Sequence, residues 1–422
     1  MLIEKIKKPD RKIDLPVTEY ILKRIEELKQ QGHPPRTLFA ACPNSISVIK
    51  ASLRSAKRNN APIMFATTLN QVDCDRGYTK FNHGEFVRYV YQECERINHT
   101  GPVIIAIDHG GPWLKDIQSV EKWSLEKAMN GVKASFEEAV KAGFQLIHVD
   151  PTVDIFIPEG ETISIDVVAS RTTELIAHIE NFRRNNNYPA ISYEVGTEEV
   201  HGGLADETTF DRFLQLLKQG LQEKGLQDVW PCFIVGKVGT DLHTTTFDKD
   251  VAILLTNKVK PLGSFIKGHY TDGVTNPEEY PRSGMGAANV GPEFTISEYE
   301  ALMELEAIET GLFEQNRIAI LSNIRETLWS AVIDSNRWKK WLQREEMGLD
   351  FQAISPERQT WLISTGCRYI WQNPEVVVSR YRLYENLQTN GIDAEEIVLS
   401  RIEHDMDKYF VNFNLINLNN FL

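Results

Sequence analysis

The chain is poor in cysteine and has no long hydrophobic stretch. Its five cysteines stand at widely spaced positions in 422 residues: Cys42, Cys74, Cys94, Cys232 and Cys367. This odd, scattered set excludes a disulfide framework and a CxxC zinc knuckle, and it fits a reducing cytoplasm. Because no run of about 18 apolar residues occurs, we expect no membrane-spanning helix. The first residues, MLIEKIKKPDRK, are charged where a secretion signal needs an apolar core.

Several functional motifs are also missing. The net charge of −13 and the lack of a basic run argue against a nucleic-acid partner, whose phosphates would repel the chain. The sequence has no GxxxxGK[ST] phosphate loop, and GMGAANVG lacks the dinucleotide-binding spacing. A GxSxG nucleophile elbow is absent as well. We therefore expect no nucleotide cofactor and no serine hydrolase chemistry.

The sequence does contain a regular alternation of short apolar runs and segments with helical periodicity. Eight runs are apolar on both faces, as parallel strands covered by helices are. They span 37–42, 62–68, 102–108, 145–150, 190–196, 232–238, 264–270 and 286–290. Between them apolar residues recur every three or four positions, as in Ile46, Ile49 and Leu53. This pattern predicts an α/β protein with a (β/α)8 TIM barrel, whose site lies at the carboxyl ends of the strands.

The alternation divides the chain into three predicted parts. An N-terminal helical extension spans 1–36, the barrel spans 37–310, and a helical C-terminal appendage spans 311–422. The seventh helix is expected to be short or missing, because TDGVTNPEEYPRSGM leaves little room before Pro281. Thr295 and Glu298 have the spacing of a capping box at the start of a further helix.

Polar residues stand at the carboxyl ends of the predicted strands, where a barrel performs its chemistry. They are Asp108, His109, His148, Asp150, Glu198, His243, His269 and Asp272. The histidines after the third, sixth and seventh strands, His109, His243 and His269, could converge on one divalent cation and leave positions open for a substrate.

Each of these residues also has a purely structural alternative. A single histidine at a strand end is often hydrogen-bonded to a backbone carbonyl. Asp108 could cap a turn, Asp150-Pro151 is a common turn opening, and Glu198 could be solvated in a charged loop. Because all of them fall at the same end of the barrel, their convergence favours a metal site.

Several fragments, in order along nearly the whole chain, resemble one family. They are TTLNQVDCDRGYT, DHGGP, IHVD, VGTE followed by Gly-Gly, HYTD, NVGPEFT and RYIWQNPEVVVSRYRLYENLQ. Together they resemble the GatZ/KbaZ family, described as the non-catalytic subunit of class II tagatose-1,6-bisphosphate aldolase. That family is similar in turn to the catalytic class II aldolases, which are zinc-dependent barrels.

The resemblance implies roles for individual residues. Asp108 would be the acid/base, and His109, His243 and His269 would bind a divalent metal, expected to be zinc, with manganese, nickel or cobalt as alternatives. Glu198 is expected as a second catalytic carboxylate. The residues expected to bind substrate are Asn44, Ser45, Asn70, Gln71, His148, Asp150, Asp272, Asn289 and Gly291.

Two functions remain open at this stage. The first is a metal-dependent enzyme that acts on a ketohexose or ketose phosphate by retro-aldol chemistry, either C4 epimerisation or aldol cleavage. The second is an accessory subunit that supports a class II aldolase. A sugar kinase, a name attached to the family, is disfavoured without a nucleotide-phosphate loop. We expect a sugar or sugar phosphate as ligand, a possible class II aldolase catalytic subunit as partner, and a homo-oligomer.

One position departs from the family pattern near the expected substrate site. Glu293 replaces the family's alanine after Gly-Pro, close to a helix start where barrels often bind phosphate. A carboxylate there would repel a phosphate, which predicts a non-phosphorylated sugar or a weakly held phosphate. Alternatively, Glu293 only caps the helix.

Overall fold

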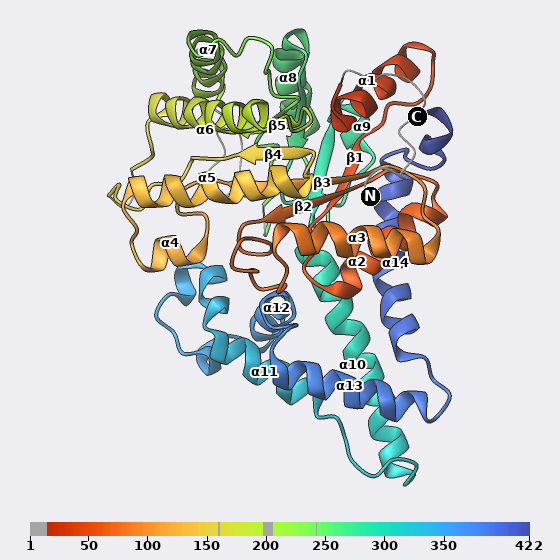
Figure 1. Cartoon of the computed structure of the whole chain (residues 1–422). Helices are drawn as coiled ribbons and strands as arrows, with labels where there is room; N and C mark the ends of the chain where they lie inside the picture. Colours follow the sequence, from red (N-terminus) through yellow and green to blue (C-terminus); the bar gives the residue numbers. More distant parts are fainter. Residues whose placement is uncertain (1–14, 159–160, 197–205, 242) are drawn as a thin grey trace.

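The centre of the protein is a closed barrel of eight parallel strands in the order β1 to β8 (Figure 1). The computed structural model describes residues 15–158, 161–196, 206–241 and 243–422. The strands are β1 (Leu38–Ala41), β2 (Ile63–Thr68), β3 (Val103–Gly110), β4 (Leu146–Val149), β5 (Ser192–Gly196), β6 (Phe233–Val235), β7 (Phe265–Gly268) and β8 (Ala287–Val290). Each coincides with one of the predicted apolar runs, which confirms the TIM barrel.

The strands are almost completely buried, and their pairing closes the sheet into a barrel. β2 and β3 stay in register from Ile63 opposite Val103 to Thr68 opposite Asp108. β1 pairs with β8 along its whole length and so closes the sheet. The parallel order brings all carboxyl ends of the strands to one end of the barrel.

Amphipathic helices cover the outside of the barrel. They are α1 (Val17–Gln30), α2 (Ile46–Arg58), α3 (His83–Ile97), α4 (Asp116–Val120), α5 (Leu125–Ala142), α6 (Ile165–Asn185), α7 (Glu207–Glu223), α8 (Lys249–Val259) and α9 (Glu279–Arg282). In α2 the predicted stripe is buried at Ile49 and Leu53. The seventh barrel helix, α9, has four residues, which confirms that it is short.

Further helices complete the chain at one side of the barrel, as Figure 1 shows. They are α10 (Pro292–Glu314), α11 (Ile324–Ser335), α12 (Pro356–Gly366), α13 (Pro374–Gln388) and α14 (Ala394–Asn412). The boundary predicted at residue 310 falls inside α10, a helix of 23 residues. α14 returns to the barrel, where Tyr409 stacks on Phe39 of β1 with ring centroids 5.4 Å apart. The C-terminal helices therefore share the core of the barrel.

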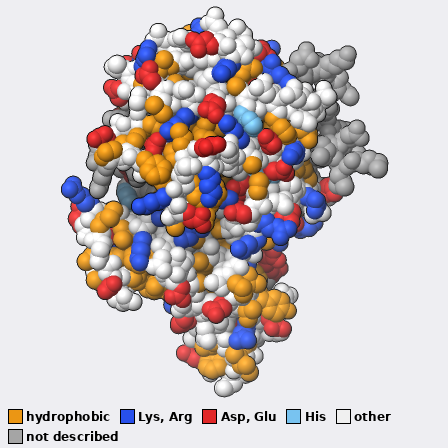
Figure 2. Space-filling view, turned by 60° about the vertical axis from the view of Figure 1, so that its left-hand side comes forward, with side chains coloured by type: hydrophobic (Ala, Val, Ile, Leu, Met, Phe, Trp, Pro, Cys, Tyr) orange, Lys and Arg blue, Asp and Glu red, His pale blue; other side chains and the backbone are white. Residues whose placement is uncertain are grey.

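The expected capping box before α10 is wrong. The helix already begins at Pro292, so Thr295 and Glu298 lie inside it, and both are buried. The N–H groups at the start of α10 instead donate to the carboxylate of Asp272, in the loop after β7. On the face drawn in Figure 2, acidic and basic side chains are interspersed rather than segregated. Among the described residues, no helix has the length and apolar character needed to cross a membrane.

Candidate active site

The Asp-His-Gly-Gly stretch places the end of β3 tightly against the end of β4. The pairing of the two strands shifts register between Ile107 and Gly110. A Cβ atom added to Gly111 would lie 1.7 Å from the carbonyl oxygen of Asp150, so only glycine fits there. His109 adopts a left-handed backbone with φ of 49°, a conformation that is uncommon outside glycine and is found at functional sites. This geometry brings Asp108 and His109 beside the predicted residues of β4.

Asp108 is buried, and nitrogen atoms of several side chains surround its carboxylate; one of them, His148 Nδ1, accepts a hydrogen bond from the His109 N–H at 3.1 Å. Asn289 Nδ2 donates to Oδ2 at 3.0 Å. Oδ1 lies 3.3 Å from His148 Nδ1, 3.6 Å from His269 Nε2 and 3.9 Å from Lys267 Nζ. Burial alone would raise the pKa of Asp108, but the nearby histidines and Lys267 outweigh it and hold the pKa well below its usual value. The carboxylate is therefore ionised.

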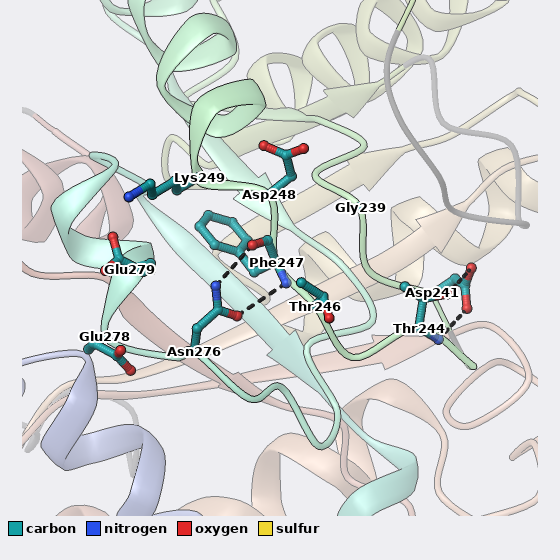
Figure 3. A pocket seen from close by; sticks show the side chains of 10 residues that line it. All are labelled: Gly239, Asp241, Thr244, Thr246, Phe247, Asp248, Lys249, Asn276, Glu278 and Glu279. Carbon is teal, nitrogen blue, oxygen red and sulfur yellow. Dashed lines mark hydrogen bonds between the residues drawn. The ribbon is translucent and has the colours of Figure 1, made fainter.

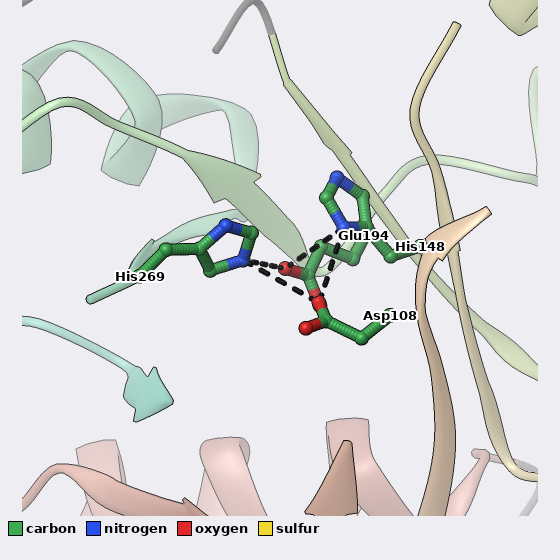
Figure 4. Close-up of side chains that lie close together, drawn as sticks. All are labelled: Asp108, His148, Glu194 and His269. Atoms are coloured by element: carbon green, nitrogen blue, oxygen red, sulfur yellow. Dashed lines mark hydrogen bonds and ion pairs between the residues drawn. The ribbon is translucent and has the colours of Figure 1, made fainter. Parts of the chain in front are cut away.

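A glutamate and a lysine face Asp108 from two further strands. Lys267 Nζ of β7 lies 2.6 Å from Glu194 Oε2 of β5, and both residues have no exposed surface. Glu194 Oε1 lies 3.0 Å from His269 Nε2 and 3.7 Å from His148 Nδ1. Burial would raise the pKa of Glu194, yet Lys267 and His148 lower it to about 2. Figure 4 shows how Asp108, His148, Glu194 and His269 point toward one another.

Three imidazoles surround these carboxylates. The ring centroids of His109 and His148 are 5.3 Å apart, those of His109 and His269 are 4.7 Å apart, and those of His148 and His269 are 5.3 Å apart. His109 Nδ1 lies 2.7 Å from Asp150 Oδ2, the arrangement in which a second carboxylate orients a metal-binding histidine. The side chain of His109 is 19% exposed, whereas the other two imidazoles are nearly inaccessible. A substrate would therefore meet the site at His109.

The chemistry of this set suits a divalent cation. Two groups of side chains each bring together ligand atoms, one per residue, that lie within 4.8 Å of one another. The first group is Asp108, His148, Glu194 and His269, and the second is His109, His148 and Asp150. Imidazole nitrogens with carboxylate oxygens bind zinc and similar metals. The Lys267 ammonium lowers the net negative charge of the set and pairs with Glu194 Oε2, whereas Glu194 Oε1 faces His269.

His243 is not brought to this site. β6 ends at Val235, and His243 is exposed on the following loop, where its ring lies 5.3 Å from that of Trp361 in α12. The metal-ligand role predicted for His243 therefore does not fit its place in the structure, because the loop carries it away from the strand ends. Within the described residues, His148 takes the place expected of the third imidazole. Glu198 lies outside the described residues.

The predicted substrate-binding residues before β3 make hydrogen bonds that join neighbouring segments, and their substrate-binding role stays a prediction. Asn44 Oδ1 accepts from Gln71 Nε2 at 2.7 Å and from Tyr78. Ser45 is the N-cap of α2 and also donates to the buried carboxylate of Glu298. The amide of Asn70 donates to the carbonyl of Leu114 and accepts from the Asp116 N–H. Asn289, by contrast, reaches Asp108 directly and is part of the site.

The N-terminus of α10, the expected phosphate position, already holds a carboxylate. Asp272 Oδ1 accepts from the N–H of Gly291 at 2.9 Å and from the N–H of Glu293 at 2.8 Å. Burial and the charge of Glu293 raise the pKa of Asp272 to about 6, against the effect of these hydrogen bonds. The carboxylate of Glu293 in turn accepts from the Gly273 N–H and contacts Lys408 and Tyr409. The Glu293 side chain thus joins α14 to the loop after β7, whereas the capping acceptor of α10 is Asp272.

Glu194 and Lys267 are the two site residues that the sequence reasoning missed. Both lie inside predicted strands, AISYEVG and SFIKGHY, whose other residues are largely apolar. A charged side chain in a strand buried on both faces needs a partner, since burying an isolated charge is costly. The opposite charges of these two strands were the signal that could have identified the pair.

A separate hollow of about 660 Å³ lies between the loops after β6 and β7 (Figure 3). Its lining residues are Gly239, Asp241, Thr244, Thr246, Phe247, Asp248, Lys249, Asn276, Glu278 and Glu279. None of the carboxylates or histidines of the barrel centre lines this hollow. The cluster of carboxylates and histidines at the barrel centre therefore lies apart from this hollow.

Comparison with known proteins agrees with the fold and identifies the family. A probable tagatose 6 phosphate kinase from Sinorhizobium meliloti 1021 has a similar structure, with a TM-score of 0.73 and 22% identity over 89% of this chain and 100% of that chain. A fructose-bisphosphate aldolase from Campylobacter jejuni gives a TM-score of 0.52 with 14% identity over 95% of both chains. At these identities the two structures support the fold alone. The sequence model of the D-tagatose-1,6-bisphosphate aldolase subunit GatZ/KbaZ-like family matches residues 22–409, and the chain therefore belongs to that family.

Proposed function

We propose that the protein is a metal-dependent carbohydrate enzyme that acts on a ketohexose or a close derivative by retro-aldol-type chemistry. The observation that carries this proposal is the convergence of Asp108, His148, Glu194 and His269 at the carboxyl ends of four strands. Burying charged groups costs several kcal/mol per ion unless they are well paired. These groups lie at the end of the barrel where barrel enzymes bind substrate.

The residues that would hold the metal are His109, His148, His269 and Glu194. We propose zinc, and manganese, nickel or cobalt would accept the same ligands. When bound, a divalent cation would polarise the carbonyl of a ketose and offset negative charge that develops on it. His109 would bind at the open side of the site, with Asp150 holding its other ring nitrogen.

Asp108 is the group we propose for proton transfer. It would remove the proton of the C4 hydroxyl, so that the C3–C4 bond opens and C4 becomes an aldehyde carbon. In an epimerisation the aldehyde turns its other face, the bond forms again, and Asp108 returns the proton to the C4 oxygen. In an aldol cleavage Asp108 would instead deliver that proton to C3 of the enolate fragment, and the ketone and aldehyde fragments would leave. Asn289 keeps Asp108 oriented through its hydrogen bond to Oδ2.

The loop after β7 disfavours a phosphate group on the substrate. Because Asp272 accepts the free N–H groups at the start of α10, a phosphate at that place would have to displace one carboxylate and approach a second, Glu293. We therefore propose a substrate that carries no phosphate at this position. Glu198, as a second carboxylate after β5, remains part of the proposal.

The experiment uses purified protein without any aldolase. Metal content is measured, and ketohexoses and keto-uronates, with and without phosphate, are screened for a change of configuration at C4. Asp108→Asn should reduce the rate at least about 100-fold, which is the usual size of a general-base contribution. Asp228→Asn, a surface variant in a salt bridge with Arg184, is the matched control and should leave the rate unchanged.

The alternative is the accessory-subunit function that the family's description suggests. It predicts that the isolated chain is inactive and that it raises the activity of an added class II tagatose-1,6-bisphosphate aldolase. In that case Asp108→Asn would support the aldolase as well as the wild type does. These results together would refute the enzyme proposal and support the accessory-subunit function.

A further inference from the structure

A second group of metal-ligating side chains lies in the segment between β2 and α3. Asp73 and Cys74 are in the loop after β2, and His83 is the first residue of α3. The loop folds back on itself through a bridge between Val72 and Phe81. One ligand atom from each of Asp73, Cys74 and His83 therefore comes within 4.8 Å of the other two. None of the three belongs to the barrel-centre site.

Asp73 is held in place before any metal binds. It is buried, and its Oδ1 accepts from Ser135 Oγ at 2.6 Å and from the N–H of Cys74 at 2.7 Å. Its Oδ2 is paired with Lys115, which also contacts Asp75. The carboxylate is thus oriented by its neighbours, as metal-binding carboxylates usually are. With two aspartates and one lysine, the surroundings keep a net negative charge that attracts a cation.

His83 is the observation that points to a ligand. Its side chain is 2% exposed, and neither ring nitrogen makes a hydrogen bond within the part of the chain that the structure describes. Nε2 lies 4.0 Å from Asp73 Oδ1, too far for a hydrogen bond. A buried polar group without a partner costs about 1–3 kcal/mol, so this imidazole lacks the compensation that buried polar groups normally have. Burial also lowers the pKa of His83, which favours the neutral ring that metals bind.

Cys74 provides the route by which a metal would enter, because it is the exposed member of the group. Partial desolvation and the Asp73 carboxylate raise the pKa of its thiol to about 11. Without a metal the thiol therefore stays protonated, and a role as a catalytic nucleophile is disfavoured. Ligand atoms of a tetrahedral zinc site lie about 3.5 Å apart, given bond lengths of about 2.0–2.3 Å. A shift on the order of 1 Å would close the group around an ion.

We propose that Asp73, Cys74 and His83 form a second metal site that takes a zinc-like divalent cation. Binding forms bonds from the ion to Asp73 Oδ1, the Cys74 sulfur and a ring nitrogen of His83, and it releases the thiol proton to solvent. The fourth position is left to water. The ion would fix the loop whose Asn70 and Gln71 join the neighbouring loops, so the site is structural. It is independent of the proposed function, since it involves none of the residues of that reaction.

The test uses Co²⁺ alone on chelator-treated full-length protein. A cobalt ion bound to a thiolate gives a charge-transfer absorption in the near ultraviolet, which a site built from histidines and carboxylates does not. We expect this band to saturate at an intensity that corresponds to one thiolate-bound Co²⁺ per chain. Cys74→Ser should abolish it and His83→Gln should weaken Co²⁺ binding at this site at least about 10-fold. Cys42→Ser, which removes a half-buried cysteine elsewhere, should keep the band.

A measurement on the unchanged protein guards against variants that fail to fold. Zn²⁺ should protect Cys74 from iodoacetamide, as mapped by mass spectrometry, and removal of Zn²⁺ should restore its alkylation. The proposal is overturned by a wild type without the thiolate band, by a band that persists in Cys74→Ser, or by alkylation of Cys74 that Zn²⁺ does not slow. A crystal soaked in Co²⁺ that shows only water between His83 and Asp73 would also overturn it.

Discussion

Replacing Lys267 with methionine removes the positive charge at the centre of the candidate site while keeping a side chain of similar length. The ammonium is fully buried, 2.6 Å from Glu194 Oε2 and 3.9 Å from Asp108 Oδ1. Without it, two carboxylates face each other with only the imidazoles to compensate them. The structure therefore predicts a loss of stability that comes from uncompensated charge rather than from lost packing.

The magnitude follows from the burial of the pair. Removing one partner of a buried ion pair costs about 3–5 kcal/mol, because the other charge is left without compensation. We expect Lys267→Met to lower the free energy of unfolding by this amount at pH 7. The double variant Lys267→Met/Glu194→Gln, which removes both charges, should recover at least half of the loss. A double-mutant cycle with the Glu194→Gln single variant gives the coupling.

The assay is urea unfolding of the metal-free variants, followed by circular dichroism. A divalent cation should stabilise Lys267→Met more than the wild type, since it would replace the missing positive charge. At a free metal concentration of 100 times the Kd, binding contributes about 2.7 kcal/mol. The reasoning is refuted if Lys267→Met costs less than about 1 kcal/mol, or if the double variant is less stable than the single one.

Three further predictions concern neighbouring features. Gly111→Ala should destabilise the protein by on the order of 3 kcal/mol because its Cβ would overlap the Asp150 carbonyl. The control Gly311→Ala, in open space within α10, should be neutral or slightly stabilising. Thermal unfolding compares the two variants, and equal melting temperatures would contradict the packing of β3 on β4. The pKa of Asp272 is raised to about 6 in the folded state, so its contribution to stability is present at pH values below its unfolded pKa and is lost as the pH rises through 6. As the pH is raised from about 4 to about 7, the free energy of unfolding in urea should therefore fall less for Asp272→Asn than for the wild type. Parallel pH profiles of the two proteins would rule this out. His148→Ala should weaken metal binding about 100-fold or more in a chelator competition, whereas the exposed His243→Ala should change it less than about twofold; a large effect of His243→Ala would restore it as a ligand.

The sequence was sufficient for the barrel because its signal is local. Each strand is a run of apolar residues, such as Val103 to Ile107, and each covering helix repeats apolar residues every three or four positions. Closure into a barrel then places every strand end on one face, so Asp108, His109, His148 and His269 could be assigned to one site. Even the shortness of α9 followed from the spacing before Pro281.

Tertiary structure decided which of the candidates meet. Glu194 and Lys267 are 73 residues apart and become partners only because β5 and β7 lie on either side of β6 in the closed barrel. His243 comes after β6 in sequence, yet the path of a loop, which no periodicity encodes, carries it to Trp361. Asp272 reaches the N-terminus of α10 for the same reason, and thereby changes what that helix start can bind. Local patterns determine which segments become strands and helices, whereas the positions of side chains on loops depend on packing and charge pairing between distant segments.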